Sequence, residues 1–437
     1  MADKLFFRHA LLPGGWAQNV AVSIKSGLIN GIAPDSRLDG EVYDIALPGM
    51  VNLHSHSFQR AMAGLAEVRS TASDSFWTWR ALMYRFALQM SPDDVTAVAV
   101  QAFIEMLEGG FCHVAEFHYL HHAPDGQEYD DIGEMAVRIA EAAAITGIDI
   151  TLLPVFYAHA GWGGQAATFE QRRFVNSINR YSRLHERCGA VAATGVAPHS
   201  LRAVMLDELL LLNEMAGTRP VHIHIAEQTA EVEACVAWHG QRPVEYLLNH
   251  APVNKNWCLV HATHANVHEL AGVTVAGAVV GLCPVTEANL GDGIFAARDY
   301  LGAWGIGSDS NICIGVADEL RALEYSQRLL LRERNVMASD ITRSTATALF
   351  QKAIEGGGQA VGEKAGIIVG QPANIIGLIG DEPDSALARW VFAGRKSQVP
   401  HVWARGNKVV SDGQHVLAEA SQRRFDAVMA RLIASTL

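Results

Sequence analysis

The sequence predicts an α/β fold: a TIM-like (β/α)₈ barrel with a small flanking β domain built from both chain termini. Short apolar segments rich in β-branched residues alternate with amphipathic helical segments through the middle of the chain. Eight such units in about 310 residues favour a closed barrel over an open sheet. On either side the chain returns to short strands and turns, and 437 residues are enough for both parts.

The elements are expected in the following order. The N-terminal part carries strand-like runs at Lys4–Leu11, Asn19–Ser23 and Leu28–Ile32. Barrel strands are expected at Met50–Leu53, Phe111–Phe117, Asp149–Val155, Ala192–Ala197, Val221–Ile225, Trp257–Val260, Ala278–Leu282 and Ala303–Gly307. Helices are expected at Pro92–Glu108, Asp131–Thr146, Phe169–Cys188, Met205–Met215, Thr229–His250 and Ala317–Arg334.

The C-terminal part completes the flanking domain. Its expected strands are Gly366–Val369, Asn374–Leu378, Val391–Phe392 and Lys408–Val410, and a helix follows at Ala420–Ile433. We therefore assign residues 1–47 and 361–437 to the small β domain, with its C-terminal helix, and residues 48–360 to the barrel.

The composition excludes several classes of protein. A formal net charge of −12 and a pI near 5.9 argue against nucleic acid or an anionic membrane surface as a partner. No apolar stretch reaches the about 18 residues of a membrane span, and the N-terminus lacks a signal-peptide pattern. The six cysteines form no CxxC pair, which is typical of reduced, buried residues. We expect a cytoplasmic protein that acts on a small molecule.

The first predicted barrel strand ends in His54-Ser55-His56. Side chains two residues apart on a strand share a face, so the two imidazoles point the same way and can bind one metal. The motif alone is weak evidence, because a second His-x-His occurs at His222 and His224.

The ends of other predicted strands supply matching groups. Strand five ends in His224, with Glu227 three residues later, strand six ends in His261, and strand eight leads into Asp309. In a barrel of this type the C-terminal strand ends form the active site. Three neutral imidazoles and a carboxylate suit Zn²⁺, with Fe²⁺ as the alternative ion, and they leave a position for water.

This set of residues suits hydrolysis of a C–N bond. A divalent metal lowers the pKa of bound water to about 7, and Asp309 can accept the water proton, so hydroxide is the nucleophile. Glu227 can carry a proton to the leaving group, and His261 can orient the attacking oxygen. A ring amide, an amidine and an aminopurine all fit this chemistry.

The stretch Ser70–Gln89 is rich in aromatic residues and precedes the first main helix. It predicts a loop and helix packed over the barrel. The alternative interpretation is a lid or dimer contact that carries Arg80 into the active site.

Six segments resemble the amidohydrolase superfamily: LPGMVNLHSHSFQR (47–60), GVAPHS (195–200), HIHIAEQ (222–228), LVHATH (259–264), TEANLGDG (286–293) and GSDSN (307–311). Within it, they resemble the deiminases that hydrolyse N-formimidoyl-L-glutamate to N-formyl-L-glutamate and ammonia in histidine degradation. The resemblance extends over essentially the whole chain. It implies one Zn²⁺ per subunit on His54, His56, His224 and Asp309, with Glu227 and His261 as proton shuttle and orienting base.

The same resemblance implies a substrate-binding set: Gln59, Arg80, Tyr119, His199 and Arg202. Charge chemistry supports it, because a substrate with two carboxylates needs multi-donor partners and arginine binds carboxylates with two parallel hydrogen bonds. We expect a homodimer, in which the partner subunit is an alternative source of Arg80. Ring-opening members with two metals carry a lysine at the end of strand four, and this sequence has none there, so one metal is expected.

Two other functions are considered. A deaminase of a heterocycle, such as guanine or an adenosine derivative, would want aromatic stacking and few cations; the Trp-rich stretch favours it, whereas His199 and Arg202 do not. A non-catalytic relative, either a scaffold or a metal sensor, would lack a ligand or have no need of Glu227 and His261.

Overall fold

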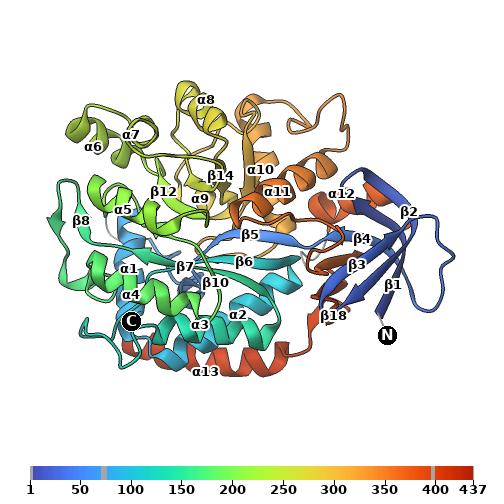
Figure 1. Cartoon of the computed structure of the whole chain (residues 1–437), viewed down its shortest axis with the longest axis horizontal. Coiled ribbons are helices and arrows are strands. Elements are labelled where there is room, and N and C mark those ends of the chain that lie inside the picture. Colours follow the sequence, from blue (N-terminus) through green and yellow to red (C-terminus); the bar gives the residue numbers. More distant parts are fainter. Residues whose placement is uncertain (1–2, 70–75, 395–398, 437) are drawn as a thin grey trace.

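The computed structural model describes residues 3–69, 76–394 and 399–436. Strands lie at its centre with helices around them (Figure 1), and the parallel strands pair into a closed ring. Isolated bridges join Val196 to Val221 on one side and Ser55 to Asp309 on the other, which closes the ring between two runs of paired strands. The barrel strands are β5 (Met50–Ser55), β6 (Phe111–His118), β7 (Asp149–Phe156), β10 (Ala193–Thr194) with β11 (Ala197–Pro198), β12 (Val221–Ile225), β13 (Trp257–His261), β14 (Val279–Leu282) and β15 (Ala303–Ile306). The predicted fold class is confirmed.

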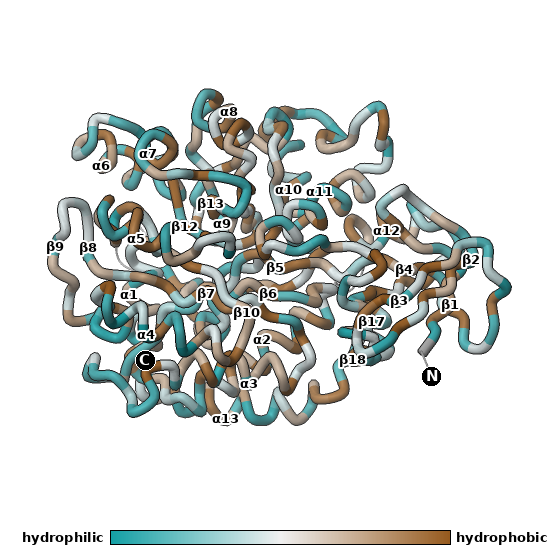
Figure 2. The backbone as a smooth tube through the Cα atoms, viewed as in Figure 1, coloured by the Kyte–Doolittle hydropathy of each residue, from teal (hydrophilic) through white to brown (hydrophobic). Residues whose placement is uncertain are grey.

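The barrel strands are buried along almost their whole length, as parallel strands covered by helices should be. Hydrophobic segments concentrate on these central strands, whereas hydrophilic ones are frequent on peripheral loops (Figure 2). The fourth strand, predicted as one run from Ala192 to Ala197, is instead split into β10 and β11. Between them, a Cβ on Gly195 would lie 2.6 Å from the Pro220 carbonyl oxygen, so the backbones approach closely there.

The six predicted outer helices occur in the predicted order with two corrections, and three further helices, at Val267–Ala276, Pro284–Leu290 and Thr345–Ala360, were not predicted. The helix expected at Phe169–Cys188 begins only at Ile178, after the short 3₁₀ turn η2 (Phe169–Gln171). The helix expected at Thr229–His250 is two helices, because Gly240 takes φ 70° and a proline begins the second. The helices in this ring are α2 (Pro92–Glu108), α3 (Glu134–Thr146), α4 (Ile178–Gly189), α5 (Leu206–Ala216), α6 (Thr229–His239), α7 (Pro243–His250), α8 (Val267–Ala276), α9 (Pro284–Leu290), α10 (Val316–Leu331) and α11 (Thr345–Ala360).

A second sheet at one end of the molecule combines strands from both termini, seen as blue and red arrows side by side in Figure 1. Two predictions for it are wrong: Gly366–Val369 forms no strand, and Val391–Phe392 lies in helix α12 (Pro383–Ala393). The strands in their spatial order are β19 (Gln414–His415), β18 (Asn407–Ser411), β17 (His401–Ala404), β16 (Ile375–Leu378), β4 (Val42–Pro48), β1 (Asp3–Leu12), β2 (Gly15–Lys25) and β3 (Leu28–Ala33). The domain bounds 1–47 with 361–437, and 48–360, stay a prediction.

Two further helices pack on the barrel. Helix α13 (Ala418–Thr436) lies along α2, where Ser421 Oγ donates to Gln101 Oε1 over 2.8 Å. It also contacts α1 (Phe76–Gln89), the helix within the aromatic stretch, whose residues 70–75 lie outside the described ranges. None of the helices in the described ranges combines the length and apolarity that a membrane crossing requires.

Candidate active site

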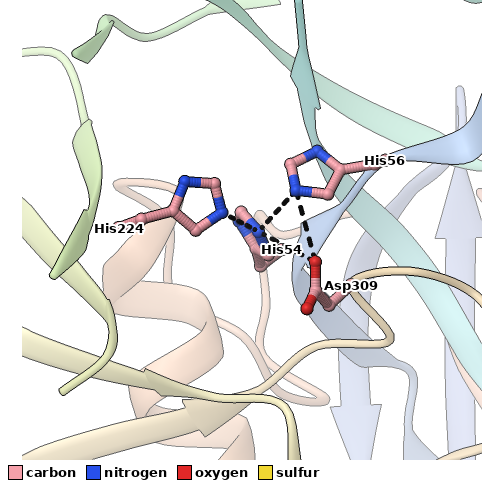
Figure 3. A group of neighbouring side chains, drawn as sticks. All are labelled: His54, His56, His224 and Asp309. Atoms are coloured by element: carbon pink, nitrogen blue, oxygen red, sulfur yellow. Dashed lines mark hydrogen bonds and ion pairs between the residues drawn. The ribbon is translucent and has the colours of Figure 1, made fainter. Parts of the chain in front are cut away.

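Three histidine rings meet at the C-terminal end of the barrel (Figure 3). His54 is the fifth residue of β5, and His56 is the first residue after that strand. Their Nε2 atoms lie 3.2 Å apart, and the Nε2 atom of His224, from β12, lies 3.0 Å from that of His54. The three side chains are buried. The prediction that His54 and His56 share a face of the strand is therefore met, and their rings lie in contact.

Backbone carbonyls fix the orientation of two of these rings. His56 Nδ1 lies 2.8 Å from the Phe117 carbonyl oxygen, and His224 Nδ1 lies 3.1 Å from that of His199. A carbonyl only accepts, so each Nδ1 carries the hydrogen and each Nε2 presents a lone pair to the centre of the site. Burial lowers the pKa of His54 to about 3 and that of His224 well below its usual range, which keeps both rings neutral.

Asp309 approaches the rings from the loop after β15. Its Oδ1 lies 3.4 Å from His54 Nε2 and 3.2 Å from His56 Nε2. Burial alone would raise the pKa of this carboxyl, but contacts with the two histidines hold it well below the usual range. The residue has φ 45°, a left-handed backbone conformation that is rare outside glycine and is often found at functional sites.

A network of side chains holds the Asp309 loop against β5. Asn52 donates to Ser308 Oγ over 2.7 Å, and Ser308 donates to Asn311 Oδ1 over 2.6 Å. Asn311 in turn donates to the His56 carbonyl oxygen over 3.0 Å. A Cβ on Gly307 would lie 2.7 Å from the His54 carbonyl oxygen, so only glycine allows this approach. The motif GSDSN therefore builds the loop as well as supplying the carboxylate.

The donor set fits a divalent metal. The Nε2 lone pairs of His56 and His224 and a carboxylate oxygen of Asp309 all lie close to His54 Nε2, an arrangement that a shared cation makes favourable. The four ligand atoms, from His54, His56, His224 and Asp309, lie within 4.8 Å of one another. A second group, His261, Cys283 and Asp309, meets the same distance limit, but burial raises the pKa of the Cys283 thiol well above its usual value. A protonated thiol is a poor ligand.

His261 and Glu227 flank the ligand set. His261 Nδ1 lies 3.2 Å from Glu287 Oε1, so it donates to that carboxylate and leaves Nε2 facing the site. This Nε2 lies 3.9 Å from both Glu227 Oε1 and Asp309 Oδ2. Burial lowers the pKa of His261, but Glu227 and the hydrogen bond to Glu287 raise it to about 10, and burial raises the pKa of Glu227. Both groups therefore hold a proton more strongly than the same side chains do in water.

All five residues of the predicted substrate-binding set line one cavity with these groups. Gln59 donates to the Tyr119 hydroxyl over 2.6 Å, while its own Oε1 is buried without a hydrogen-bond partner in the described structure. The Nε atom of Arg202 is likewise buried and unpartnered within the described ranges. The cavity thus offers an unpaired amide acceptor and an unpaired guanidinium donor. They indicate a ligand that carries both a hydrogen-bond donor and a hydrogen-bond acceptor.

His199 and Arg80 complete the cavity wall. His199 Nδ1 lies 3.0 Å from Ser200 Oγ, and burial lowers the pKa of the ring well below its usual range, aided by the neighbouring Arg202. The Arg80 guanidinium lies 4.4 Å from the centre of the Trp77 ring. It reaches the cavity from α1 of the same chain, so the cavity has this cation without a partner subunit.

Sequence reasoning missed several cavity residues. Tyr84 and Tyr157 line it beside the two arginines, and Phe174 packs against Tyr119 with ring centres 5.1 Å apart. Tyr84 lies on α1, within the aromatic stretch already predicted to pack over the barrel, whereas no motif marks Tyr157 or Phe174. Glu287 lies within the quoted segment TEANLGDG, and the glutamate there was a signal that could have identified the partner of His261.

Comparisons with known proteins agree with this architecture. Residues 45–409 match the profile described as the amidohydrolase family. The chain belongs to the amidohydrolase family. It is 47% identical, over 99% of its length and all of the relative's, to a formimidoylglutamate deiminase of Pseudomonas aeruginosa. Another relative, a 5-methylthioadenosine/S-adenosylhomocysteine deaminase of Natronomonas pharaonis, is 24% identical over 87% of this chain and 84% of its own.

Solved structures place the chain among amidohydrolases in three dimensions. An amidohydrolase from Brucella melitensis has a TM-score of 0.96 and 49% sequence identity, covering 98% of this chain and 99% of its own. An adenosine deaminase from Xanthomonas campestris with bound zinc has a TM-score of 0.80 over 99% of this chain and 98% of its own. At 21% identity, that likeness supports the fold alone.

Glu287→Gln tests whether the carboxylate on His261 supports turnover. Loss of the charge weakens the hydrogen bond that orients the ring, so we expect kcat to fall by about 10- to 100-fold with little change in KM. The measurement is steady-state ammonia release. Glu319→Gln is the matched control, because Glu319 is also buried and accepts from the same helix, at Val285 N over 3.0 Å. Equal kcat values for Glu287→Gln and wild type would contradict the expectation.

Proposed function

We propose that this amidohydrolase is a formimidoylglutamate deiminase, which hydrolyses N-formimidoyl-L-glutamate to N-formyl-L-glutamate and ammonia. The observation that carries the proposal is a single cavity that is lined by three of the four proposed metal ligands and by two arginines, Arg80 and Arg202. The 47% identical relative with that activity, matched over its full length, supports the same substrate.

One Zn²⁺ per subunit, or Fe²⁺ in its place, is the proposed cofactor, held by His54, His56, His224 and Asp309. When bound, a divalent metal supplies Lewis-acid activation of water near neutral pH. His56 and His224 are held as neutral ligands by their Nδ1 hydrogen bonds, which leave the Nε2 lone pairs free.

The residues of the chain divide the proton transfers. The oxygen of water bonds to the formimidoyl carbon, and the Asp309 carboxylate takes a water proton. Glu227, whose buried carboxyl holds a proton more strongly than an exposed glutamate, passes that proton to the imino nitrogen as the oxygen adds. Asp309 then gives the water proton to the same nitrogen, which departs as ammonia as its bond to carbon breaks. Glu227 takes the remaining hydroxyl proton as the formyl C=O forms, which restores both side chains. His261, fixed by Glu287, donates its Nε2 hydrogen toward the attacking oxygen and orients it.

The substrate-binding set matches the two ends of the substrate. Arg80 and Arg202 bind its carboxylates, for which planar guanidinium groups are the preferred partners. Gln59 offers its free Oε1 to the N–H groups of the amidine, and Tyr119 holds the amide of Gln59 in place. His199, neutral and next to Arg202, completes the polar wall.

The setting of this activity is also part of the proposal. Because the proposed substrate is N-formimidoyl-L-glutamate, we propose that the enzyme acts in histidine degradation. The described cysteines are all free thiols, which supports the proposal that the protein is located in the reducing cytoplasm. A homodimer remains the proposed assembly, with small molecules rather than nucleic acid as ligands.

The experiment that tests the function is ammonia release by zinc-loaded enzyme on a small panel. The panel holds N-formimidoyl-L-glutamate, its aspartate homologue, guanine, adenosine and a neutral formamidine, with chelated enzyme as the control. Turnover of the glutamate compound alone supports the proposal. Turnover of a purine instead would favour a heterocycle deaminase and contradict the role of the arginines. No ammonia from any compound, with zinc bound, would favour a non-catalytic relative.

Arg202→Met tests the carboxylate partner. Methionine keeps the length of the side chain but offers no donor, so we expect KM for N-formimidoyl-L-glutamate to rise about 10- to 100-fold with kcat within about threefold. Steady-state kinetics measure both constants. Arg183→Met is the control, since Arg183 is a solvent-exposed partner of Glu128. An unchanged kcat/KM would mean that Arg202 does not touch the substrate.

A further inference from the structure

Arg173 is a fully buried arginine that makes no ion pair with a carboxylate in the described structure. Its guanidinium donates instead to neutral oxygens on three sides. Nε donates to the His122 carbonyl oxygen over 2.6 Å, Nη1 to those of Ala87 and Met90, the latter over 2.8 Å, and Nη2 to the Tyr129 hydroxyl over 3.3 Å. Burial lowers the pKa of Arg173 to about 10, which still leaves it charged at neutral pH.

Two of these acceptors belong to the end of α1. Ala87 lies in its last turn, and Met90 is the residue directly after Gln89, where the helix ends. The last carbonyls of a helix have no partner within it, and the negative end of the helix dipole favours a cation. Arg173 therefore caps the C-terminus of the helix that carries Arg80.

The same short segment holds α1 at a second point. Gln171 donates to the Tyr84 hydroxyl of α1 over 3.2 Å and to the Tyr157 hydroxyl of the barrel over 2.7 Å. Phe174 packs against Tyr84 with ring centres 5.8 Å apart. Residues 171–174 thus contact both α1 and the barrel.

The segment itself is fixed to the barrel. The backbone N–H groups of His121 and His122 both donate to the Arg173 carbonyl oxygen over 3.0 Å. These residues follow closely after β6, the strand whose end leads into Tyr119. Arg173 therefore links the barrel to α1. Its backbone carbonyl accepts hydrogen bonds from the barrel, and its side chain donates hydrogen bonds to the end of the helix.

We propose that Arg173 is a positioning residue for substrate recognition: it fixes α1 on the barrel and so sets where Arg80 meets a substrate carboxylate. The inference rests on the proposed function, in which Arg80 binds the substrate. Arg173 touches no reacting group itself. Arginine is needed because its planar fork reaches acceptors in several directions, whereas lysine donates from a single atom.

The first test needs no substrate. Hydrogen–deuterium exchange of Arg173→Lys is compared with wild type and with the matched control Arg172→Lys. Arg172 lies on the same segment but donates to the carbonyl oxygens of Pro124 and Phe169, away from α1. We expect about tenfold faster exchange in residues 76–90 of Arg173→Lys, with the barrel strands unchanged, and no such change in the control.

The second test separates positioning from general damage. For N-formimidoyl-L-glutamate, Arg173→Lys should raise KM about tenfold with kcat within about twofold, and a neutral formamidine should keep its kcat/KM. In an Arg80→Met background, the Arg173→Lys change should add less than about twofold to KM, because both act through one contact.

These outcomes distinguish the inference from the proposed function. Absence of wild-type turnover would overturn the function, while the exchange result would still decide whether Arg173 fixes α1. Unchanged exchange in residues 76–90, an equal loss on the neutral formamidine, or additive effects with Arg80→Met would overturn the inference. If Arg173→Lys does not yield folded protein, Arg173→Gln, which keeps an amide donor but not the guanidinium fork, takes its place, and exchange in residues 76–90 decides in the same way.

Discussion

Replacing Asp309 with asparagine is expected to abolish turnover while the fold survives. The change removes at once a ligand charge and the group that takes the water proton, so kcat should fall by at least about 10³-fold. The backbone bonds that seat this residue, His56 N to Asp309 O and Asp309 N to His54 O at 2.9 Å each, need no carboxylate. The amide has nearly the same shape, so the loop geometry should be kept.

The Asp309→Asn measurement combines three readouts. Ammonia release gives kcat, metal analysis of the purified protein gives occupancy, and thermal unfolding reports the fold. Asp299→Asn, an exposed aspartate close in sequence, is the control for the chemical change itself. A near-normal kcat in metal-loaded Asp309→Asn would contradict the assigned mechanism, because one residue could then be neither the base nor a required ligand.

The strand ends could be predicted from the sequence because parallel strands bring their carboxyl ends to one face. His54, His224, His261 and Asp309 each follow a short apolar run, and the structure places all four within one buried cluster. Local pattern was sufficient there, since strand period and strand order fix both the side and the end of the barrel.

Elements whose ends depend on turns were less predictable. Apolar residues continue past Gly240, so the pattern indicated one long helix where the structure has α6 and α7. Val391–Phe392 looked like a strand because both residues are β-branched or aromatic, yet they pack as part of α12. Tertiary packing overrides such short-range preferences.

Two contacts of the site could not be found by local reasoning at all. Tyr84 and Tyr157 are 73 positions apart and meet through Gln171, so only the path of the loops brings them to one cavity. Arginine is usually found on the surface, but Arg173 is buried, and backbone carbonyl oxygens accept the hydrogen bonds of its guanidinium there. The first contact joins side chains and the second goes to backbone carbonyls, and in neither case does a local sequence pattern indicate the partner.

Glu227→Gln is expected to lower kcat by about 10²- to 10⁴-fold with KM little changed. Glutamine has nearly the same shape and can hold hydrogen bonds, but it cannot release and recover a proton. Burial raises the pKa of Glu227, which makes the carboxyl a proton carrier at a higher pH than an exposed glutamate. Substrate binding depends on other groups, chiefly Arg80 and Arg202, so it should persist.

Single-turnover kinetics of Glu227→Gln would locate the loss in the chemical step. The neighbouring Glu233→Gln is a suitable control, since Glu233 is an exposed residue of α6. Because His261 Nε2 lies 3.9 Å from Glu227, a direct transfer from His261 to the leaving nitrogen is the competing route. That route predicts a kcat of Glu227→Gln within about tenfold of wild type, and a large fall in kcat excludes it. The size of the fall therefore identifies which of the two groups delivers the proton to ammonia.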